Sequence, residues 1–326
     1  MRRMTLFAAL LLTVAACGST GQSTSTTASS GETSTSLEVT TTAVPATTIT
    51  ESSGFPVTVS DANGEVVIDA RPERIVSLSS TGTEMLFAVG AGDQVVAVDE
   101  FSTYPDEAPI TDLSGFTPNL EAIVGYEPDL VVISFDPGEL QSGLDAVGVP
   151  SLLLTTALSL DDVYAQLEVI GAATGHLPEA AEVVLGMQTD IDEIVSTTSV
   201  PEGISFYHEV DETLYSASSS SFLGQIYALL GMENIADAAD PDGIGFPQLA
   251  SEYVVSQDPD LIILADVDFG VTPESLTDRP GWDAMTAVVN GAIVELDADL
   301  ASNWGPRIVI LLQTVADAVM EMEPVS

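Results

Sequence analysis

The first half of the chain alternates between short apolar runs and stretches in which apolar residues recur with helical spacing. The runs that have the length of buried strands lie at 75–78, 95–98, 130–134 and 152–155. The helical stretches begin at about residue 81, near 119–124 and after residue 137. Thr81 and Glu84 have the spacing of a capping box, and Asn63-Gly64 lies between two valine-rich runs, as in a tight hairpin. This alternation predicts a parallel sheet with helices on both faces.

Two amphipathic helices follow without a flexible linker, and the second of them opens at Pro178, a residue that favours the first turn of a helix. The alternation then resumes, with apolar segments at 204–207, 222–230, 261–264, 282–289 and 293–296. The last helix begins near Pro306 and carries an apolar stripe from Ile308 to Met322. The pattern predicts an α/β protein organised as a lobe, a helical connector and a second lobe.

An internal repeat relates the two predicted lobes. Residues 121–133 (EAIVGYEPDLVVI) match residues 252–264 (EYVVSQDPDLIIL) without a gap. Each copy predicts a short helix that opens with glutamate, stops before Pro-Asp and leads into a buried strand. Glu121 and Glu252 therefore occupy equivalent places, where they can contact a two-fold symmetric partner. The alternative is that both glutamates simply favour helix N-termini.

The N-terminus has the features of an export signal. Arg2 and Arg3 precede an apolar stretch at 4–14, and small residues lead up to Cys17. This arrangement resembles a bacterial lipobox, so we expect a signal peptide at 1–16 and a lipid on Cys17, which anchors the chain on the extracytoplasmic side of the cell membrane. The alternative is ordinary cleavage that leaves a free thiol. Residues 17–54 are dominated by Ser, Thr, Gly and Ala, which predicts a disordered tether.

The charge is strongly acidic, with 6 Lys+Arg against 50 Asp+Glu and a formal net charge of -44. All six basic residues are arginine. A nucleic-acid partner is excluded, because no basic surface is available to neutralise phosphates. The acidity has two interpretations: a solvated surface adapted to a salty medium, or a patch for a cationic partner.

Three segments resemble a known family. The stretch at 74–93 (RIVSLSSTGTEMLFAVGAGD), the Asn119-Leu-Glu121 step and the Trp304-Gly-Pro-Arg307 step are similar to the periplasmic binding proteins for ferric siderophores, haem and vitamin B12. The resemblance covers about residues 55 to 326. It implies two Rossmann-like lobes with mostly parallel sheets, joined by a single long helix, with bounds at 55–176, 177–199 and 200–326. It also implies an ABC permease dimer with its ATPase as partner, a monomeric protein, and Glu121 and Glu252 as the docking residues.

The resemblance is strongest to the vitamin B12-binding branch, and it implies a set of ligand contacts in the cleft between the lobes. These are Phe101, Phe116, Phe135, His208, Phe246 and Asp299. Aromatic faces suit a corrin, a porphyrin or a siderophore, because they offer large apolar contact with little loss of rotamer entropy. For each aromatic residue taken alone, core packing is the alternative.

The expected ligand is a corrinoid or a ferric siderophore, delivered to the permease. Few arginines remain after removal of the signal peptide, which disfavours anionic ligands such as catecholate siderophores. Haem is the alternative ligand, with His208 as a candidate iron ligand. A cell-surface sensor that reuses the fold is the alternative function. We expect no resident cofactor, no metal site and no catalysis, since the sequence lacks the usual nucleophile and metal motifs.

Overall fold

The structure is a computed structural model and describes residues 54–322. Its first lobe is built on a parallel sheet with the strand order β5-β4-β3-β6-β7. The strands are β3 (Ile75–Leu78), β4 (Val95–Asp99), β5 (Ile110–Leu113), β6 (Leu130–Ile133) and β7 (Ser151–Leu153). A separate antiparallel hairpin, β1 (Val57–Asp61) with β2 (Gly64–Ile68), precedes this sheet.

Short helices connect the strands of the first lobe. They are α1 (Ser80–Ala88), η1 (Gly92–Gln94), α2 (Leu120–Val124), η2 (Pro137–Glu139) and α3 (Leu140–Ala146). All neighbouring strands of this sheet pair in parallel, so the carboxyl ends of all five strands lie at the same edge.

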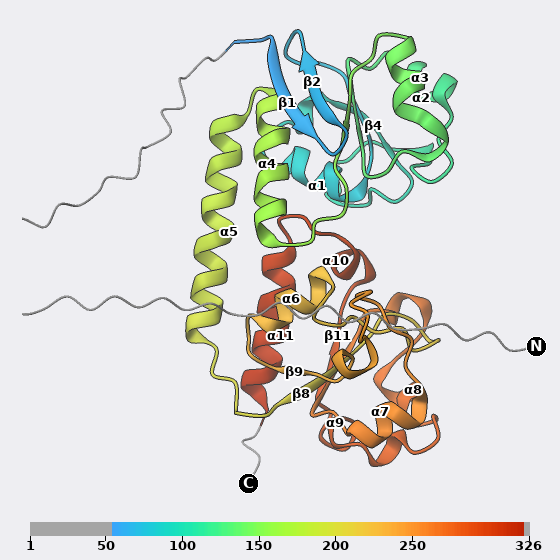
Figure 1. Ribbon diagram of the computed structural model, residues 1–326, viewed down its shortest axis with the longest axis vertical. Helices are drawn as coiled ribbons and strands as arrows, with labels where there is room; N and C mark the ends of the chain where they lie inside the picture. Colours follow the sequence, from blue (N-terminus) through green and yellow to red (C-terminus); the bar gives the residue numbers. More distant parts are fainter. Residues whose placement is uncertain (1–53, 323–326) are drawn as a thin grey trace, which may run out of the picture. The chain divides into compact units, whose positions relative to one another are not determined.

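The second lobe repeats this plan with a smaller parallel sheet of order β11-β10-β8-β9 (Figure 1). Its strands are β8 (Ser205–Glu209), β9 (Glu233–Asn234), β10 (Leu261–Leu264) and β11 (Ile293–Glu295). Its helices are α6 (Phe222–Ala228), η3 (Asp237–Ala239), α7 (Ser251–Gln257), η4 (Val267–Phe269), α8 (Pro273–Leu276), η5 (Trp282–Ala284), α9 (Thr286–Asn290) and α10 (Ala298–Ser302).

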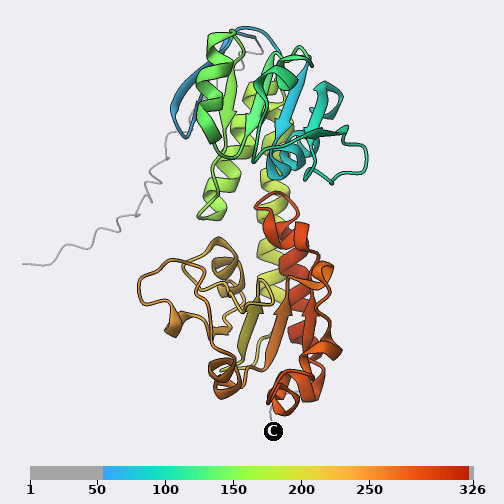
Figure 2. The same cartoon turned by 90° about the vertical axis from the view of Figure 1, so that its right-hand side faces the viewer.

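Three longer helices pack along one side of the two lobes: α4 (Leu160–Thr174), α5 (Leu177–Thr197) and α11 (Ile308–Glu321). The α5 helix runs beside both lobes, and α4 and α11 pack against it at different heights (Figures 1 and 2). Gly175 ends α4 with a φ of 79°, which lets the chain turn back at once into α5. One continuous helix therefore bridges the lobes, as the pattern and the resemblance predict.

Apolar residues of the central strands alternate between two faces of each sheet. In β6, Leu130 and Val132 pack towards α4 and α5, whereas Val131 and Ile133 pack on the opposite face. All four residues of β3, β6 and β10 are buried, because helices cover both faces of each sheet. The core is thus three-layered in both lobes.

Local expectations were correct for the main elements and wrong in detail at the start of α1 and over residues 282–289. The N-cap of α1 is Ser79, whose Oγ accepts from Gly82 N at 3.0 Å, and no capping box joins Thr81 to Glu84. Glu84 is instead buried and contacts the other lobe, as described below. At the hairpin, only Gly64 has a positive φ, of 139°, because the Asp61 side chain holds the turn by accepting from Asn63 N and Gly64 N. The predicted segment at 282–289 is two pieces, η5 and α9, separated at Met285.

Candidate functional site

A cavity of about 640 Å³ lies between the two lobes, at the carboxyl ends of their strands. Residues at the carboxyl ends of β3, β4, β5 and β6 form its first-lobe wall, and residues at the carboxyl ends of β8, β10 and β11, with part of α6, contribute to its second-lobe wall. The volume is in the range of small-molecule sites. The carboxyl edge of a parallel sheet is the usual place for ligands in α/β folds, because the loops there converge.

Phenylalanine side chains dominate this cavity. Five of the nine phenylalanines within residues 54–322 are exposed, and all five line it: Phe101, Phe116, Phe135, Phe246 and Phe269. Phe116 lies between two neighbours, with its ring centroid 5.2 Å from that of Phe101 and 5.5 Å from that of Phe135. Exposing large apolar rings costs free energy unless they bind something, so their concentration at one place marks a recognition surface.

The structure brings together the whole set of ligand contacts that the sequence predicts. All six line this cavity: Phe101, Phe116, Phe135, His208, Phe246 and Asp299. The two docking candidates lie elsewhere. Glu121 and Glu252 are exposed at the second positions of α2 and α7, outside the cavity. Cys17 lies outside the described residues.

Sequence reasoning missed several residues of the cavity wall, including Phe222, Phe269, Asn303 and Trp304. The internal repeat gives no sign of Phe269, because its register places Asp266, and not Phe269, opposite Phe135. Trp304 could not be assigned from its spacing. Its indole Nε1 donates to Gln166 Oε1 at 3.0 Å, across the boundary between α10 and α4.

Among residues 54–322, no arginine or lysine lines the cavity. Within residues 54–322 the four arginines are engaged elsewhere, with Arg71 near His176, Arg74 on backbone carbonyls, and Arg279 and Arg307 in ion pairs. The charged residues in the wall are the acids Asp99 and Asp299. Burial raises the pKa of Asp99, and the Ser102 hydroxyl, which donates to it at 2.7 Å, opposes that shift. The cavity is therefore apolar with a mildly acidic rim.

His208 lies at the floor of the cavity and is fully buried. Burial lowers the pKa of His208 to about 4, so the ring is neutral near pH 7. Its Nδ1 lies 3.2 Å from the Tyr227 hydroxyl, and its Nε2 has no hydrogen-bond partner. The ring thus offers one unpaired nitrogen beneath the phenylalanine wall.

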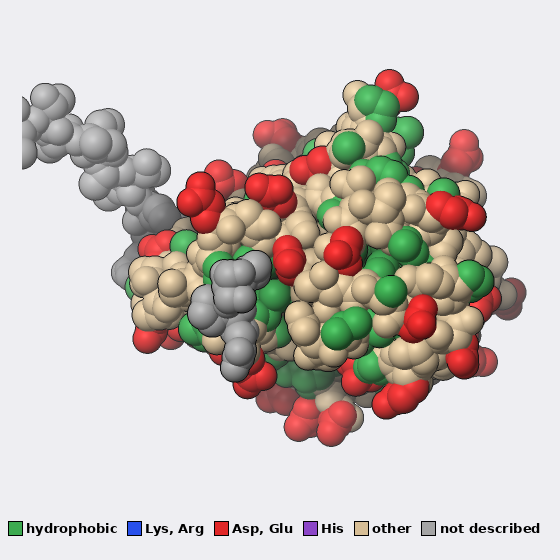
Figure 3. Space-filling model, turned by 90° about the horizontal axis from the view of Figure 1, so that it is seen from below, with side chains coloured by type: hydrophobic (Ala, Val, Ile, Leu, Met, Phe, Trp, Pro, Cys, Tyr) green, Lys and Arg blue, Asp and Glu red, His purple; other side chains and the backbone are tan. Residues whose placement is uncertain are grey.

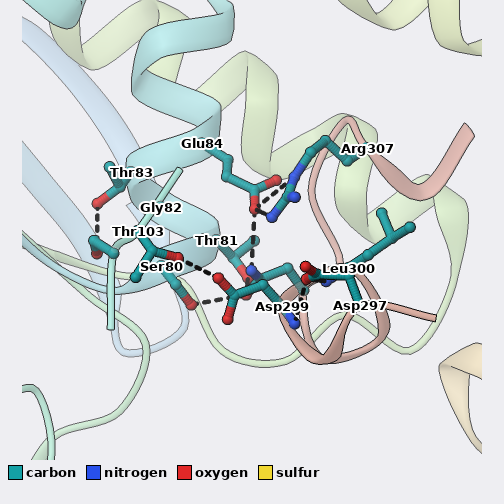
Figure 4. A network of polar contacts seen from close by, with 12 residues as sticks. Ser80, Thr81, Gly82, Thr83, Glu84, Thr103, Asp297, Asp299, Leu300 and Arg307 are labelled. Carbon is teal, nitrogen blue, oxygen red and sulfur yellow. Dashed lines mark hydrogen bonds and ion pairs between the residues drawn. The ribbon is translucent and has the colours of Figure 1, made fainter. Parts of the chain in front are cut away.

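A polar network joins the lobes beside the cavity (Figure 4). Glu84 of α1 pairs with Arg307, which precedes α11, and also accepts from Asn303 Nδ2 at 3.0 Å. Asn303 Oδ1 accepts from two hydroxyls at the start of α1, those of Ser80 and Thr81. Nearby, Thr103 donates to Asp299 across the lobe boundary. These contacts hold one flank of the cavity closed.

Among residues 54–322, no cluster of three or more His, Cys, Asp or Glu has a geometry that could hold a metal ion. Over the same residues, none of the helices combines the length and the apolar character needed to cross a bilayer.

Comparison with known proteins places this architecture in a family. Residues 75–300 match the family described as Periplasmic binding protein. The chain is 31% identical over 278 residues to an uncharacterized ABC transporter substrate-binding lipoprotein of Bacillus subtilis, covering 81% of this chain and 86% of that one. It is 30% identical over 285 residues to a cobalamin-binding protein of Halobacterium salinarum, covering 81% of this chain and 74% of that one.

Solved structures share the fold. A possible iron-binding periplasmic solute-binding protein of Staphylococcus epidermidis has a TM-score of 0.66 at 25% identity, over 77% of this chain and 100% of that one. The periplasmic vitamin B12 binding protein of Vibrio cholerae has a TM-score of 0.62 at 22% identity, over 77% and 99%. A periplasmic heme-binding protein of Roseiflexus has a TM-score of 0.67 at 24% identity, over 77% and 98%.

The family match, the two related lobes and the cavity between them agree with one another. The chain belongs to the periplasmic binding protein family, as an extracytoplasmic substrate-binding protein of an ABC transporter in the group that serves vitamin B12, siderophores and haem, and not as an enzyme.

Proposed function

We propose that this protein is a lipid-anchored binding protein that captures a corrinoid such as vitamin B12, or a ferric siderophore, in the interlobe cavity and delivers it to its permease. The observation that carries this proposal is the gathering of all five exposed phenylalanines of residues 54–322 in that cavity. Flat or bulky metal chelates present the large apolar faces that such a wall can cover.

Charge favours a corrinoid over haem or a catecholate siderophore. Haem carries propionate carboxylates, and ferric catecholates are anionic. Burying such groups without a cation is costly, and the cavity offers only the carboxyl groups of Asp99 and Asp299. A corrinoid carries amide arms, which the hydroxyls of Ser80, Thr156 and Ser302 in the cavity wall can pair with.

Haem remains the second candidate because of His208. A neutral imidazole with one nitrogen already engaged is a common iron ligand, and His208 has this arrangement through Tyr227. Full burial of the ring argues against it, since the iron would have to reach Nε2 through the cavity floor. If haem is the ligand and His208 binds its iron, the wild-type protein should show the absorption spectrum of a histidine-ligated haem. His208→Ala should lose that spectrum.

Anchoring and docking complete the proposal. Residues 1–16 serve as signal peptide and Cys17 carries the lipid, in keeping with the lipoprotein relative from Bacillus subtilis. Glu121 and Glu252 dock the permease. Their helices, α2 and α7, lie on the side of the molecule away from α5, one in each lobe (Figure 1). Charge reversal by Glu121→Lys with Glu252→Lys should abolish uptake into cells and leave the affinity for the solute unchanged.

The ligand assignment is tested by fluorescence titration of residues 18–326. Trp304 lines the cavity and reports on occupancy. We expect saturable quenching by cyanocobalamin at micromolar or lower concentration, compared in parallel with ferrioxamine and haem. Phe246→Ala should weaken binding by about 1–2 kcal/mol, roughly 5–30-fold. Leu185→Ala is the matched control, because Leu185 is a similarly exposed apolar residue on α5, outside the cavity. Equal losses in both variants, or no saturable signal, would contradict the assignment.

A further inference from the structure

Two buried carboxyl groups lie next to the second-lobe wall of the cavity, and a single arginine interacts with both of them. Glu209 ends β8 and is fully buried, and Asp266 follows the adjacent strand β10. Arg279 donates to both carboxylate oxygens of Glu209, at 2.6 and 2.7 Å, and its guanidinium lies 4.5 Å from the ring centroid of Trp282. Both of these hydrogen bonds of Arg279 therefore go to Glu209.

Asp266 has no comparable partner. Its side chain is 1% exposed, and neither of its oxygens receives a hydrogen bond from the residues described. The titratable or charged groups that face it are Tyr207 and Glu209 from β8 and Arg279 from the loop after α8. One positive charge cannot balance two buried carboxylates, so this arrangement favours the protonated form of Asp266. A proton on Asp266 also turns this orphaned acceptor into a donor towards Glu209.

We propose that Asp266 and Glu209 form a proton-binding site, and that loss of its proton displaces the segment that carries Phe269 and weakens solute binding. The second half of this proposal rests on the proposed function. The site is separate from the solute contacts, because neither Asp266 nor Glu209 lines the cavity.

The proton is expected to leave within the physiological range. Burial and the negative charge of Glu209 together raise the pKa of Asp266 to about 7, against the opposing effect of Arg279. A carboxyl group with so high a pKa is neutral in mildly acidic medium and charged in mildly alkaline medium.

Asp266 is directly connected to the cavity wall. Its carbonyl accepts from Phe269 N at 3.0 Å, which forms the single turn η4. Both Ala265 and Phe269 line the cavity, and Phe269 is 82% exposed. In the same turn, Asp268 accepts from Ala298 N at 2.9 Å and so holds α10, the helix of Asp299. Repulsion between the charged carboxylates of Asp266 and Glu209, at the base of this turn, is therefore transmitted both to Phe269 and to α10.

The proton site is tested without ligand, by thermal unfolding of the full chain between about pH 5 and about pH 8.5. The folded state binds a proton that the unfolded state releases at lower pH, so this site's stabilisation is lost as the pH rises through about 7. Asp266→Asn keeps the shape of the neutral side chain and cannot lose the proton, so it should remove this loss of stability. The difference between the wild-type and variant curves of melting temperature against pH then measures the contribution of the site. Asp283→Asn removes one exposed aspartate from the same lobe and should leave the curve parallel to that of the wild type. A wild-type curve parallel to that of Asp266→Asn would overturn the proposal.

The coupling is tested with cyanocobalamin as probe. We expect the wild-type affinity to be about 3–10-fold weaker at about pH 8.5 than at about pH 5.5, and the affinity of Asp266→Asn to be equal at both. Phe269→Ala should lose the pH dependence of binding and keep the pH dependence of unfolding. A pH-independent wild-type affinity would overturn the coupling. If cyanocobalamin does not bind at either pH, the proposed ligand is wrong, and the unfolding curves still decide the proton site.

Discussion

Charged side chains in the interior of this protein connect segments that are distant in sequence. Glu84 and Arg307 join the two lobes, and Glu209 and Arg279 join a strand to a loop within the second. Arg307 also lies over the ring of Tyr104, with its guanidinium 4.1 Å from the centroid. With only four arginines in residues 54–322, the loss of a single one removes a large share of the compensation available to buried acids.

Arg307→Ala should therefore destabilise the protein strongly. It leaves the buried Glu84 carboxylate without its cation, and removing one partner of a buried pair costs about 3–5 kcal/mol. Arg74→Ala is the control, because exposed Arg74 bonds only to backbone carbonyls and should cost about 1 kcal/mol. Urea unfolding of both variants measures the difference. Similar losses would show that the interlobe pair contributes no more than a surface contact.

The stability of the folded protein at acidic pH depends on His208. Burial lowers the pKa of His208 to about 4, whereas an unfolded histidine titrates near 6.5. The stabilisation from its neutral form is complete above about pH 6.5 and is lost as the pH falls towards 4. His208→Gln should flatten this part of the curve of melting temperature against pH. His176→Gln, at a less buried histidine, should change it much less, and equal effects would contradict the assignment.

The sequence indicated some of these residues and not others, for a physical reason. Phe101, Phe135 and His208 follow or end predicted strands, and the carboxyl edge of a parallel sheet is where such residues converge. Glu84 was predicted as a helix cap because local spacing gave no sign of Arg307, far along the chain. Long-range pairs of this kind depend on how the lobes pack, which no local pattern encodes.

Among the helices, the contact between α4 and α5 depends on one glycine. A Cβ added at Gly171 would lie 2.4 Å from the Cβ of Ala180 and 3.0 Å from the carbonyl oxygen of His176. The helices can therefore approach closely only because this position lacks a side chain. Gly186, on α5, has no neighbour within 4 Å of such a Cβ.

These two glycines should respond oppositely to the same substitution. Gly171→Ala should destabilise by about 1–3 kcal/mol, since it forces the helices apart. Gly186→Ala should stabilise by up to about 1 kcal/mol, since alanine favours the helix more than glycine does. Denaturant unfolding of both variants measures these changes in the free energy of unfolding. A Gly171→Ala protein as stable as the wild type would show that the α4–α5 contact adjusts freely.

Elements with strong periodicity were predictable, and short ones were not. The apolar stripes of α4, α5 and α11 and the buried runs of β3, β6 and β10 have clear patterns. The two-residue strand β9 and the single turn η4 are too short to carry a period. One of these, η4, holds Phe269, so the missed element is also the one that supplied an unpredicted wall residue.

For the protein as a whole, two lobes of similar plan face each other across a cavity and are held by α5 and by the Glu84–Arg307 network. The outer surface is acidic, and the face shown in Figure 3 carries scattered Asp and Glu with no Lys or Arg in view. Such a surface keeps the protein soluble and repels anions, whereas the cavity is apolar. Because the cavity wall is apolar and the outer surface is acidic, an apolar solute is bound in the cavity in preference to the outer surface.

Calorimetric titration of the chain from residue 18 with cyanocobalamin decides whether the interlobe cavity binds a corrinoid. We expect one ligand per chain, a dissociation constant of about a micromolar or below, and a negative heat-capacity change from burial of the phenylalanine wall. We also expect marked weakening when Phe116 and Phe246 are both replaced by alanine. Absence of saturable heat, or binding unaffected by those replacements, would contradict the claim that this cavity is a corrinoid site.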